Sequence, residues 1–314
     1  MAAIRTTALR KDFGDVQAVA DLDLTVESGE VFGFLGPNGA GKSTTINILL
    51  GFLRPSSGSV QVLGTDVTVD SLGVRRRTGL LPEGYEPYQN LTGREHVRSA
   101  IDTKGADDDP DVLLERVGLN PEAARRAAGG YSTGMQQRLA LAIALVGDPE
   151  LLILDEPSAG LDPDGVALLR DIVREESTRG ATVFFSSHIL EEVEKVCDRV
   201  AILDDGRLVA EDSIDGLRAE LGAAATITVE FEDGAVTDDG LAAVRSVGGV
   251  DDVTRANEKV TVDVARPSAK MPALQTLGEI GTAADVQVED ASLEALFEAY
   301  TGERPEADAN GGVS

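Results

Sequence analysis

A glycine-rich loop constrains this chain more than any other stretch. Val31–Leu35 is apolar, Gly36–Thr44 reads GPNGAGKST, and Thr45–Gly51 continues with a helical pattern. This is the spacing G-x-x-x-x-G-K-[S/T] with a strand before it and a helix after it, and that context is what confirms the motif. Glycines let backbone N–H groups approach phosphate oxygens, and the helix start adds its own unpaired N–H groups. The stretch therefore predicts a phosphate-binding loop rather than an ordinary glycine-rich turn.

Two side chains of this loop have expected tasks. Lys42 is expected to reach the β- and γ-phosphates of a nucleotide, and the hydroxyl of Ser43 is expected to hold Mg²⁺.

A run of four aliphatic residues ending in two acids forms a second candidate feature. Leu151–Leu154 is followed by Asp155 and Glu156. A continuous apolar run is typical of a buried parallel strand, and ligands bind at the carboxyl ends of such strands. An Asp at that place holds Mg²⁺ in phosphate-loop enzymes. His188 ends the predicted strand Ala181–Ser186 and is expected at the same edge, where a neutral imidazole could bond a γ-phosphate.

The composition favours an acidic, thiol-poor protein of about two domains. The chain has 314 residues, one cysteine (Cys197) and a formal net charge of −27. A single thiol allows no disulfide framework and no cysteine-based zinc cluster. Acids spread along the whole chain suit a saline cytoplasm, which predicts a halophile, with an acidic mesophile as the alternative. No basic stripe is present for nucleic acid, so none is expected as a partner.

Neither a signal peptide nor a membrane span is predicted. The segment Met1–Arg5 is followed by no long apolar region, and no stretch approaches the roughly 18 apolar residues of a spanning helix. The chain is expected to be soluble by itself.

The remaining pattern divides the chain into parts. Three short strands are predicted before the loop, at Ile4–Leu9, Val16–Val19 and Leu22–Val26. A capping box at Thr92–Glu95 opens a helical insertion. After Leu221 the pattern becomes strand, helix, strand, strand, helix, strand, helix, with the last helix at 292–300; a β-α-β-β-α-β order is typical of ferredoxin-like domains.

Taken in order, the motifs resemble those of the ATP-binding cassette (ABC) ATPases. The resemblance rests on Lys42, Tyr131–Arg138, Leu151–Glu156, Ala159–Asp162 and His188. The YSTGMQQR variant is similar to the branch that powers small exporter permeases for drugs, lipids or antibiotics, a branch that often carries an extra C-terminal domain. The implied fold class is α/β, a P-loop NTPase ABC ATPase domain with a mixed core sheet, an antiparallel β edge and a helical subdomain, followed by a small α+β ferredoxin-like domain.

The resemblance implies domain limits as well as a partner. The ATPase domain would span residues 1–221 with its helical subdomain at about 92–146, the accessory domain 222–302, and a disordered polar tail 303–314. The cofactors would be ATP and Mg²⁺. The chain would act as a homodimer, or paired with a related ABC subunit, on a separate multi-span permease. It would be cytoplasmic and peripheral on the inner face of the cell membrane, with the loop Gly84–Glu95 as the permease contact.

Individual roles also follow from the resemblance. Glu156 would be the general base, assisted by Lys42 and by His188 at the γ-phosphate. Asp155 would act on Mg²⁺ through water, and Glu83 stands where the family usually has a Gln that senses Mg²⁺ and the partner. Asp162 would lie at the dimer interface. The residues expected to contact nucleotide are Phe13 against the base, Gly36, Pro37, Asn38, Gly39, Ala40, Gly41, Lys42, Ser43 and Thr44 around the phosphates, and Ser132 and Gly134 on the ATP of the opposite protomer.

Two other functions are weighed against the exporter ATPase. A soluble cassette ATPase acting on nucleic acid or ribosomes is disfavoured, because the chain has one phosphate loop, no sustained heptads and a charge that opposes phosphate backbones. A catalytically silent nucleotide-binding cassette is disfavoured because Lys42 and Glu156 are both present.

Overall fold

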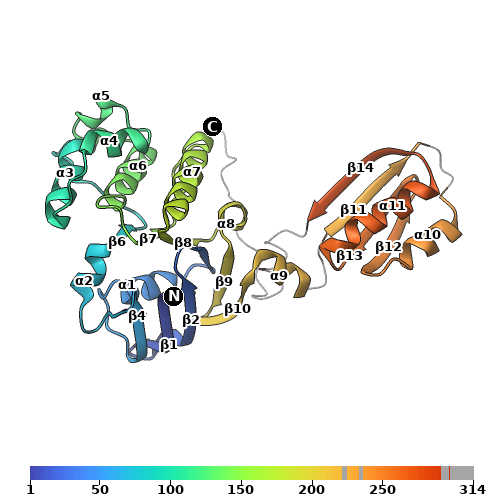
Figure 1. Cartoon of the computed structure of the whole chain (residues 1–314), viewed down its shortest axis with the longest axis horizontal. Coiled ribbons are helices and arrows are strands. Elements are labelled where there is room, and N and C mark those ends of the chain that lie inside the picture. The colour runs from blue at the N-terminus through green and yellow to red at the C-terminus, as the bar shows by residue number, and fades with distance from the viewer. Residues whose placement is uncertain (221–224, 233–235, 291–296, 298–314) are drawn as a thin grey trace. The chain divides into compact units, whose positions relative to one another are not determined.

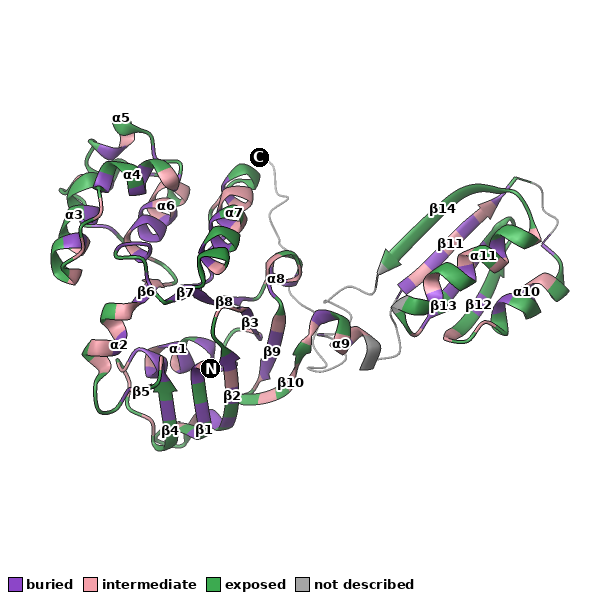
Figure 2. Cartoon of the chain, in the orientation of Figure 1, coloured by how far each residue is buried: buried purple, intermediate pink, exposed green. Residues whose placement is uncertain are grey.

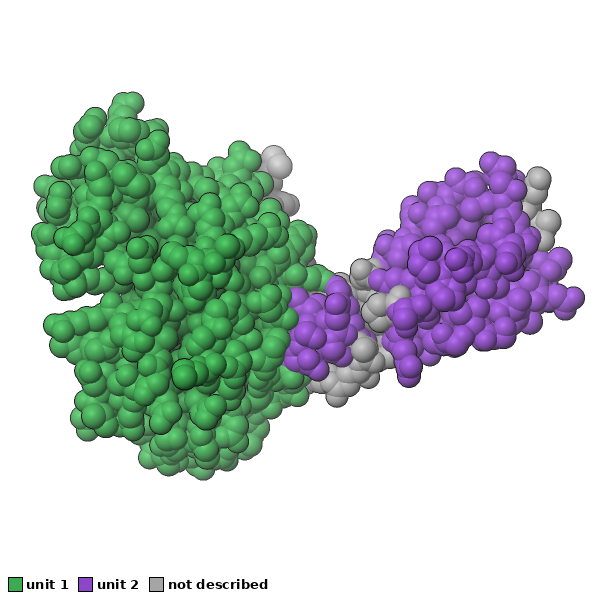
Figure 3. Space-filling view, viewed as in Figure 1, with its two compact units in different colours: residues 1–211 green, residues 212–314 purple. Residues whose placement is uncertain are grey.

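The structure, a computed structural model, describes residues 1–220, 225–232, 236–290 and 297. The chain forms two compact units, residues 1–211 and 212–314 (Figure 3). Three expectations lie outside the described residues: the domain boundary at 221–222, the tail from 303, and the helix over 292–300 except for residue 297.

A six-stranded sheet in the order β10-β9-β3-β8-β7-β6 forms the centre of the first unit (Figure 1). Strand β3 pairs in parallel with β8 and β9, and β7 pairs in parallel with β6 and β8. Strands β3, β7 and β8 are buried along their whole length (Figure 2), which explains their continuous apolar sequences. The strands are β3 (Val31–Leu35), β6 (Thr78–Leu81), β7 (Leu151–Asp155), β8 (Thr182–Ser187), β9 (Arg199–Asp204) and β10 (Arg207–Ser213).

A second, four-stranded sheet in the order β2-β1-β4-β5 forms the antiparallel edge. The prediction of three short pieces was wrong here, because the second and third pieces form one strand, β2. The first piece extends to Phe13 as β1, and a turn at residues 14–15 separates the two strands as expected. Asp21 adopts a left-handed φ of 49° inside β2, and the pairing of β1 with β2 shifts register several times. Such bulges absorb an extra residue and let the strand continue. The strands are β1 (Ala2–Phe13), β2 (Val16–Glu27), β4 (Ser57–Val62) and β5 (Thr65–Asp66).

Helices surround the central sheet and form the helical insertion. The predicted capping box is confirmed: the Glu95 N–H donates to Thr92 Oγ1 and the Thr92 N–H donates to Glu95 Oε2. None of the described helices is long and apolar enough to cross a bilayer. The helices of this unit are α1 (Lys42–Leu49), α2 (Ser71–Arg77), α3 (Gly93–Lys104), α4 (Pro110–Arg116), α5 (Pro121–Ala124), η1 (Ala128–Gly130), α6 (Thr133–Ala144), α7 (Pro163–Arg179) and α8 (Leu190–Val196). Helix α9 (Ile214–Glu220) belongs to the second unit.

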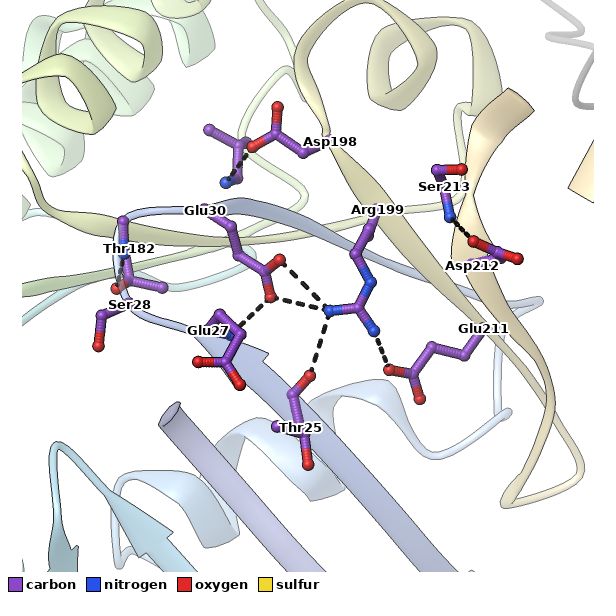
Figure 4. A network of polar contacts seen from close by, with 12 residues as sticks. Thr25, Glu27, Ser28, Glu30, Thr182, Asp198, Arg199, Glu211, Asp212 and Ser213 are labelled. Atoms are coloured by element: carbon purple, nitrogen blue, oxygen red, sulfur yellow. Dashed lines mark hydrogen bonds and ion pairs between the residues drawn. The ribbon is translucent and has the colours of Figure 1, made fainter. Parts of the chain in front are cut away.

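An arginine at the start of β9 ties the two sheets together (Figure 4). Arg199 Nη1 lies 3.2 and 3.3 Å from the two carboxylate oxygens of Glu30, and Nη2 donates to Glu211 on β10. The same Nη1 donates to the carbonyl of Thr25 on β2 at 3.5 Å. Because a guanidinium donates in several directions at once, one side chain connects β2, β10 and the turn before β3.

The cysteine of the chain is packed inside this unit. Cys197 is buried, and its Sγ would lie 3.2 Å from a Cβ added at Gly33 in β3. Burial raises the pKa of the Cys197 thiol far above its usual range. The thiol therefore serves as core packing.

The second unit contains a four-stranded antiparallel sheet in the order β12-β13-β11-β14. Its elements follow one another as β-α-β-β-α-β, with one apolar core formed by the sheet and helices α10 and α11. Assignment to the ferredoxin-like fold stays a prediction. The elements are β11 (Ala225–Phe231), α10 (Asp238–Arg245), β12 (Val250–Ala256), β13 (Lys259–Val264), η2 (Pro267–Ala269), α11 (Lys270–Ile280) and β14 (Ala283–Asp290).

A buried carboxylate joins the helical insertion to the central sheet's flanking helix. Glu176 on α7 is 1% exposed and lies 2.8 Å from Nη2 of Arg116 on α4 and 3.2 Å from Nε of Arg179. Its neighbour Glu175 also reaches Arg116, at 3.0 Å, but is exposed. Two guanidinium groups therefore satisfy one carboxylate that is removed from water.

We expect Glu176→Ala to lower the free energy of unfolding by about 3 kcal/mol, because removing one partner of a buried ion pair leaves the others uncompensated. Glu175→Ala removes the exposed partner of the same Arg116 and should cost less than about 1 kcal/mol. Urea unfolding of both variants measures the difference. Equal losses would contradict the assignment of Glu176 as the joining residue.

Candidate functional site

The predicted phosphate loop connects β3 to α1, and its glycines are required by geometry. Gly39 and Gly41 adopt φ of 88° and 102°, which side-chain-bearing residues rarely adopt. A Cβ at Gly41 would lie 2.4 Å from the carbonyl oxygen of Ala18, and one at Gly36 would lie 2.6 Å from that of Leu203. The loop is thus pressed between β2 and the end of β9.

Lys42 opens α1 and points back across the loop. It is 7% exposed, and its Nζ donates to the carbonyls of Gly36 at 2.7 Å and Pro37 at 3.3 Å. Its Nζ also lies 3.8 Å from Oε1 of Glu156. Burial lowers the pKa of Lys42, while the charges of Glu156, Asp155 and Glu83 oppose that shift. The ammonium is therefore held in place by loop oxygens, where phosphate oxygens are stronger acceptors.

Three carboxylates from neighbouring strand ends meet the loop. Glu83 follows β6, and Asp155 and Glu156 end β7 and begin the next loop. All three line one cavity of about 210 Å³ together with the phosphate loop. The residues lining it are Ala18, Pro37, Asn38, Gly39, Gly41, Lys42, Ser43, Thr44, Glu83, Asp155 and Glu156.

Asp155 has the chemistry of a cation ligand. It is 6% exposed, and its Oδ1 is buried with no hydrogen-bond partner. Burial raises the pKa of Asp155, and the charges of Glu83 and Glu156 act in the same direction, while the Ser186 side chain and the charge of Lys42 oppose the shift.

The oxygens at this place fit Mg²⁺ that arrives with a nucleotide. The Ser43 hydroxyl and the Glu83 and Asp155 carboxylates line the cavity, and Mg²⁺ prefers oxygen ligands and few protein groups. Among the described residues, no cluster of three or more His, Cys, Asp or Glu side chains is placed to hold a metal unaided. A site completed by phosphate oxygens and water is consistent with both observations.

The predicted base and the predicted histidine are in direct contact. Nδ1 of His188 lies 2.7 Å from Oε2 of Glu156. Since an ionised carboxylate only accepts, the Nδ1 of His188 carries the proton. The parallel neighbours β7 and β8 bring the pair together, because Glu156 follows β7 and His188 follows β8. The backbone of Glu156 is left-handed, with φ of 49°, which is uncommon for a residue with a side chain.

Ser132 and Gly134 lie in a separate cavity of about 430 Å³. Ser132 is the N-cap of α6, and its Oγ accepts from the Met135 N–H. We call this cavity the signature pocket, after the YSTGMQQR motif to which Ser132 and Gly134 belong. It shares no lining residue with the phosphate cavity. Its lining residues are Gly118, Leu119, Asn120, Ala123, Ser132, Thr133, Gly134, Met135, Arg138, Gly160 and Asp162. One chain thus presents a phosphate loop and a helix N-terminus that do not face the same space.

Of the residues predicted at this site, Phe13, Gly36, Ala40 and His188 do not line the phosphate cavity. Phe13, at the end of β1, is 48% exposed, and the ammonium of Lys11 lies 4.9 Å from its ring centre. Ala40 belongs to the phosphate loop without lining the cavity; its carbonyl accepts from the Gly206 N–H at 3.1 Å.

The sequence analysis missed Gln137. This residue on α6 is 7% exposed, and its Nε2 donates to the carbonyls of Glu156 and Pro157 at 3.2 and 2.9 Å. The available signal was a polar residue on the buried face of a predicted helix. Gln137 belongs to the YSTGMQQR motif, but within that motif only Ser132 and Gly134 were predicted to bind nucleotide.

An apolar groove of about 400 Å³ was also missed as a site, although the loop beside it was predicted as a contact. Tyr88 stacks on His96 with ring centres 6.0 Å apart, and the Tyr88 N–H donates to Nε2 of His96. The groove is lined by Leu50, Phe52, Arg75, Thr78, Leu80, Tyr85, Tyr88, Leu91, His96, Ser99, Ala100, Thr103, Lys104 and Ile143.

The fold and the two cavities define a phosphate-loop ATPase with a signature helix. The sequence profile of the ABC transporter family matches residues 19–159. The bacitracin transport ATP-binding protein BcrA of Bacillus licheniformis is 42% identical over 221 residues, which are 68% of this chain and 71% of that protein. The linearmycin resistance ATP-binding protein LnrL of Bacillus subtilis (strain 168) is 32% identical over 304 residues, 94% of this chain and 96% of that protein.

A solved structure of an ATP-binding subunit of an ABC transporter superposes with a TM-score of 0.66 at 30% identity, over 70% of this chain and 93% of that one. The chain therefore belongs to the ABC transporter ATP-binding proteins. It is an ATP-hydrolysing subunit of the export type.

We expect Asp155→Asn to stabilise the nucleotide-free protein at pH 7 while abolishing ATP hydrolysis. The folded-state pKa of Asp155 is raised above its unfolded value. Its contribution to stability is therefore present at low pH and is lost as pH rises through the folded pKa. Removing the charge should raise the Tm by roughly 2–4 °C, the equivalent of about 1 kcal/mol in a domain of this size.

Thermal unfolding at pH 4 and pH 7 measures this effect, with Asp164→Asn, in the first turn of α7, as a control carboxylate elsewhere. The gain should appear at pH 7 and shrink towards pH 4. A lower Tm of Asp155→Asn at pH 7 would contradict the interpretation.

Proposed function

We propose that two copies of this chain, or one copy and a related subunit, enclose two ATP molecules with Mg²⁺ and drive export through a separate membrane permease. The observation that carries the dimer is the separation of the phosphate cavity from the signature pocket within one chain. A γ-phosphate bound at Lys42 reaches no signature residue of its own subunit. The Ser132 hydroxyl and the N–H groups at the start of α6 are suited to an anion supplied by the partner.

Hydrolysis would use the pair of Glu156 and His188. Glu156 accepts a proton from the water that attacks the γ-phosphate, and ADP and phosphate leave. His188 holds the carboxylate through its Nδ1–H. To donate to a γ-phosphate oxygen as well, its Nε2 must also carry a proton, as in the imidazolium. The left-handed backbone at Glu156 is the kind of local strain that functional sites retain.

Nucleotide binding would rearrange few groups. Lys42 exchanges the carbonyls of Gly36 and Pro37 for the β- and γ-phosphates. Ser43, Asp155 and Glu83 would hold Mg²⁺, which when bound neutralises charge on the phosphates. Glu83 adds a negative charge at the place of the usual Gln, so it should make binding more dependent on the cation.

The permease would dock in the apolar groove beside the loop Gly84–Glu95. Tyr88 is 77% exposed and Phe52 is 56% exposed, and Leu91, which directly precedes the capping box in the sequence, also lines the groove. An exposed apolar groove rimmed by polar groups is typical of an interaction surface. Glu83 connects this surface to the phosphate cavity, since it lies one residue before the loop. Docking there would place the chain on the inner face of the cell membrane.

The acidic composition would adapt the chain to a saline cytoplasm. Fifty-five acids stand against 28 bases, giving the formal charge of −27. Repulsion among so many carboxylates destabilises the compact state and is screened by salt.

We expect Glu156→Gln to bind ATP without turning it over, to remain dimeric with ATP and to retain a multi-span membrane protein. The amide cannot accept the proton, so the closed dimer persists. Affinity capture of the tagged variant from its native membranes, with ATP and Mg²⁺, followed by identification of co-purified proteins, measures this. Ribosomes or nucleic acid without a membrane protein would overturn the exporter assignment, and unchanged hydrolysis would remove Glu156 from the base role.

A second substitution tests the groove in the same experiment. Glu156→Gln combined with Tyr88→Asp should still dimerise but lose the membrane protein. The matched control is Val112→Asp on α4, which charges an apolar side chain that is 60% exposed outside the groove. Retention of the permease by the Tyr88 variant would place docking elsewhere.

We expect the free energy of unfolding to rise as KCl increases from 0.1 to 2 M, because the Debye length falls from about 10 Å to a few ångströms. Glycine betaine at matched osmolality is the control. It carries no net charge, so it stabilises only by being excluded from the protein surface and does not screen the carboxylates. Stability that is flat or falls with KCl, while betaine stabilises, would contradict the halophilic interpretation.

A further inference from the structure

The buried glutamine of the signature helix holds the backbone of the catalytic base. Gln137 Nε2 donates to the carbonyl of Glu156 at 3.2 Å and to that of Pro157 at 2.9 Å. A primary amide has two N–H groups, so both bonds can be made at once. With 7% of Gln137 exposed, water is a poor substitute for either carbonyl.

Gln137 holds the backbone of Glu156, which has a conformation that is unfavourable for a residue with a side chain. Glu156 has a φ of 49°, in the left-handed region that disfavours side chains. Two further contacts hold it: the Glu156 N–H donates to Ser186 at 3.0 Å, and the Ala159 N–H donates to the Glu156 carbonyl at 3.3 Å. The direction of the Glu156 carboxylate follows from this backbone, so a change at Gln137 reaches the carboxylate.

The whole segment from Glu156 to Asp162 lies along the first turns of α6. A Cβ at Gly160 would lie 2.6 Å from Cγ2 of Thr133, and one at Gly134 would lie 2.9 Å from the Gly160 carbonyl. Arg138 Nη2 lies 3.2 Å from Oδ1 of Asp162. The helix start and the segment that follows the base are therefore in contact on both sides of Gln137.

We propose that Gln137 is a positioning residue that transmits the binding of the partner's ATP at Ser132 and Gly134 to the Glu156 of the same subunit. The helix N-terminus meets the partner's γ-phosphate, and Gln137 lies roughly 7 Å farther along the same rigid helix. A shift of α6 towards that phosphate moves the carbonyls of Glu156 and Pro157 with it. Each subunit then hydrolyses its own ATP only when its signature helix holds the ATP of the other.

This inference rests on the proposed dimer and adds a route between its two sites. It explains why a polar side chain occupies a buried position on α6 where an aliphatic one would pack. It also assigns a purpose to the close contact of Gly160 with Thr133, since a loose segment could not follow the helix.

The test is the steady-state ATPase activity of the full-length chain carrying Gln137→Met, which keeps the size of the side chain and removes both donors. We expect kcat to fall about 10- to 100-fold, as small misplacements of a catalytic group do. The KM for ATP should stay within about twofold, because no ligand of the phosphates changes. The Hill coefficient for ATP should fall towards 1, because the two sites no longer communicate.

Thr6→Val is the matched control. Thr6 is 3% exposed, and its Oγ1 donates to the carbonyl of Leu22 at 2.8 Å on the antiparallel edge. This variant loses a buried bond of the same kind, so it should lose stability without any change in kcat, KM or Hill coefficient. A purely structural role for Gln137 would make the two variants behave alike, and that result would overturn the proposal.

Gln137→Glu is the second variant, used also if Gln137→Met does not fold. When ionised, its carboxylate faces two carbonyls; when protonated, it regains one donor. Activity relative to wild type should therefore recover as pH falls, and a constant ratio would overturn the proposal. Glu156→Gln distinguishes failure of the proposed base from failure of the positioning role. Normal hydrolysis by this variant would contradict the role of Glu156 as base. If it is inactive while both Gln137 variants match wild type, only the positioning role of Gln137 is contradicted.

Discussion

The parallel pairing of the central strands is the constraint on which the site depends. Strands β6, β7, β8 and β3 run in one direction, so their carboxyl ends lie along one edge of the sheet. That edge brings together a carboxylate after β6, two at the end of β7, a histidine after β8 and the glycine loop after β3. None of these groups would be near the others in an antiparallel arrangement. The chemistry is therefore distributed along the sequence from Gly36 to His188 and gathered by the pairing of parallel strands.

The site concentrates negative charge around one lysine, and burial makes that arrangement costly without ligand. Lys42 faces Asp155, Glu156 and Glu83, and its pKa is lowered by burial although all three oppose the shift. The pKa of Asp155 is raised by the same loss of water. Displaced pKa values of this kind are frequent at functional sites. A nucleotide with its cation supplies charges of both signs to this cavity.

Local features of the site were predictable from the sequence, and features made by tertiary contact were not. Three predicted features each span fewer than ten consecutive residues: the phosphate loop, the apolar run ending at Asp155 and the capping box at Thr92. His188 was expected at the same sheet edge as Glu156, but their direct hydrogen bond depends on β7 lying beside β8, which no local pattern indicates. The long strand β2 was divided in error because Asp21 is a poor strand residue, and a bulge carries the strand past it. Gln137 was missed because its partners are backbone carbonyls. Every residue has a backbone carbonyl, so the sequence does not indicate which ones Gln137 contacts.

The buried state of Cys197 has a practical consequence for following this protein in motion. It is the single cysteine of the chain, it is packed against β3, and its thiol pKa is raised by burial. Thiol reagents act on the exposed thiolate, so the native chain is close to inert towards them. A cysteine introduced on the surface would then be the one reactive thiol, without any need to alter the core. A fluorophore or spin label attached there would report closure of the signature pocket in an otherwise unmodified protein.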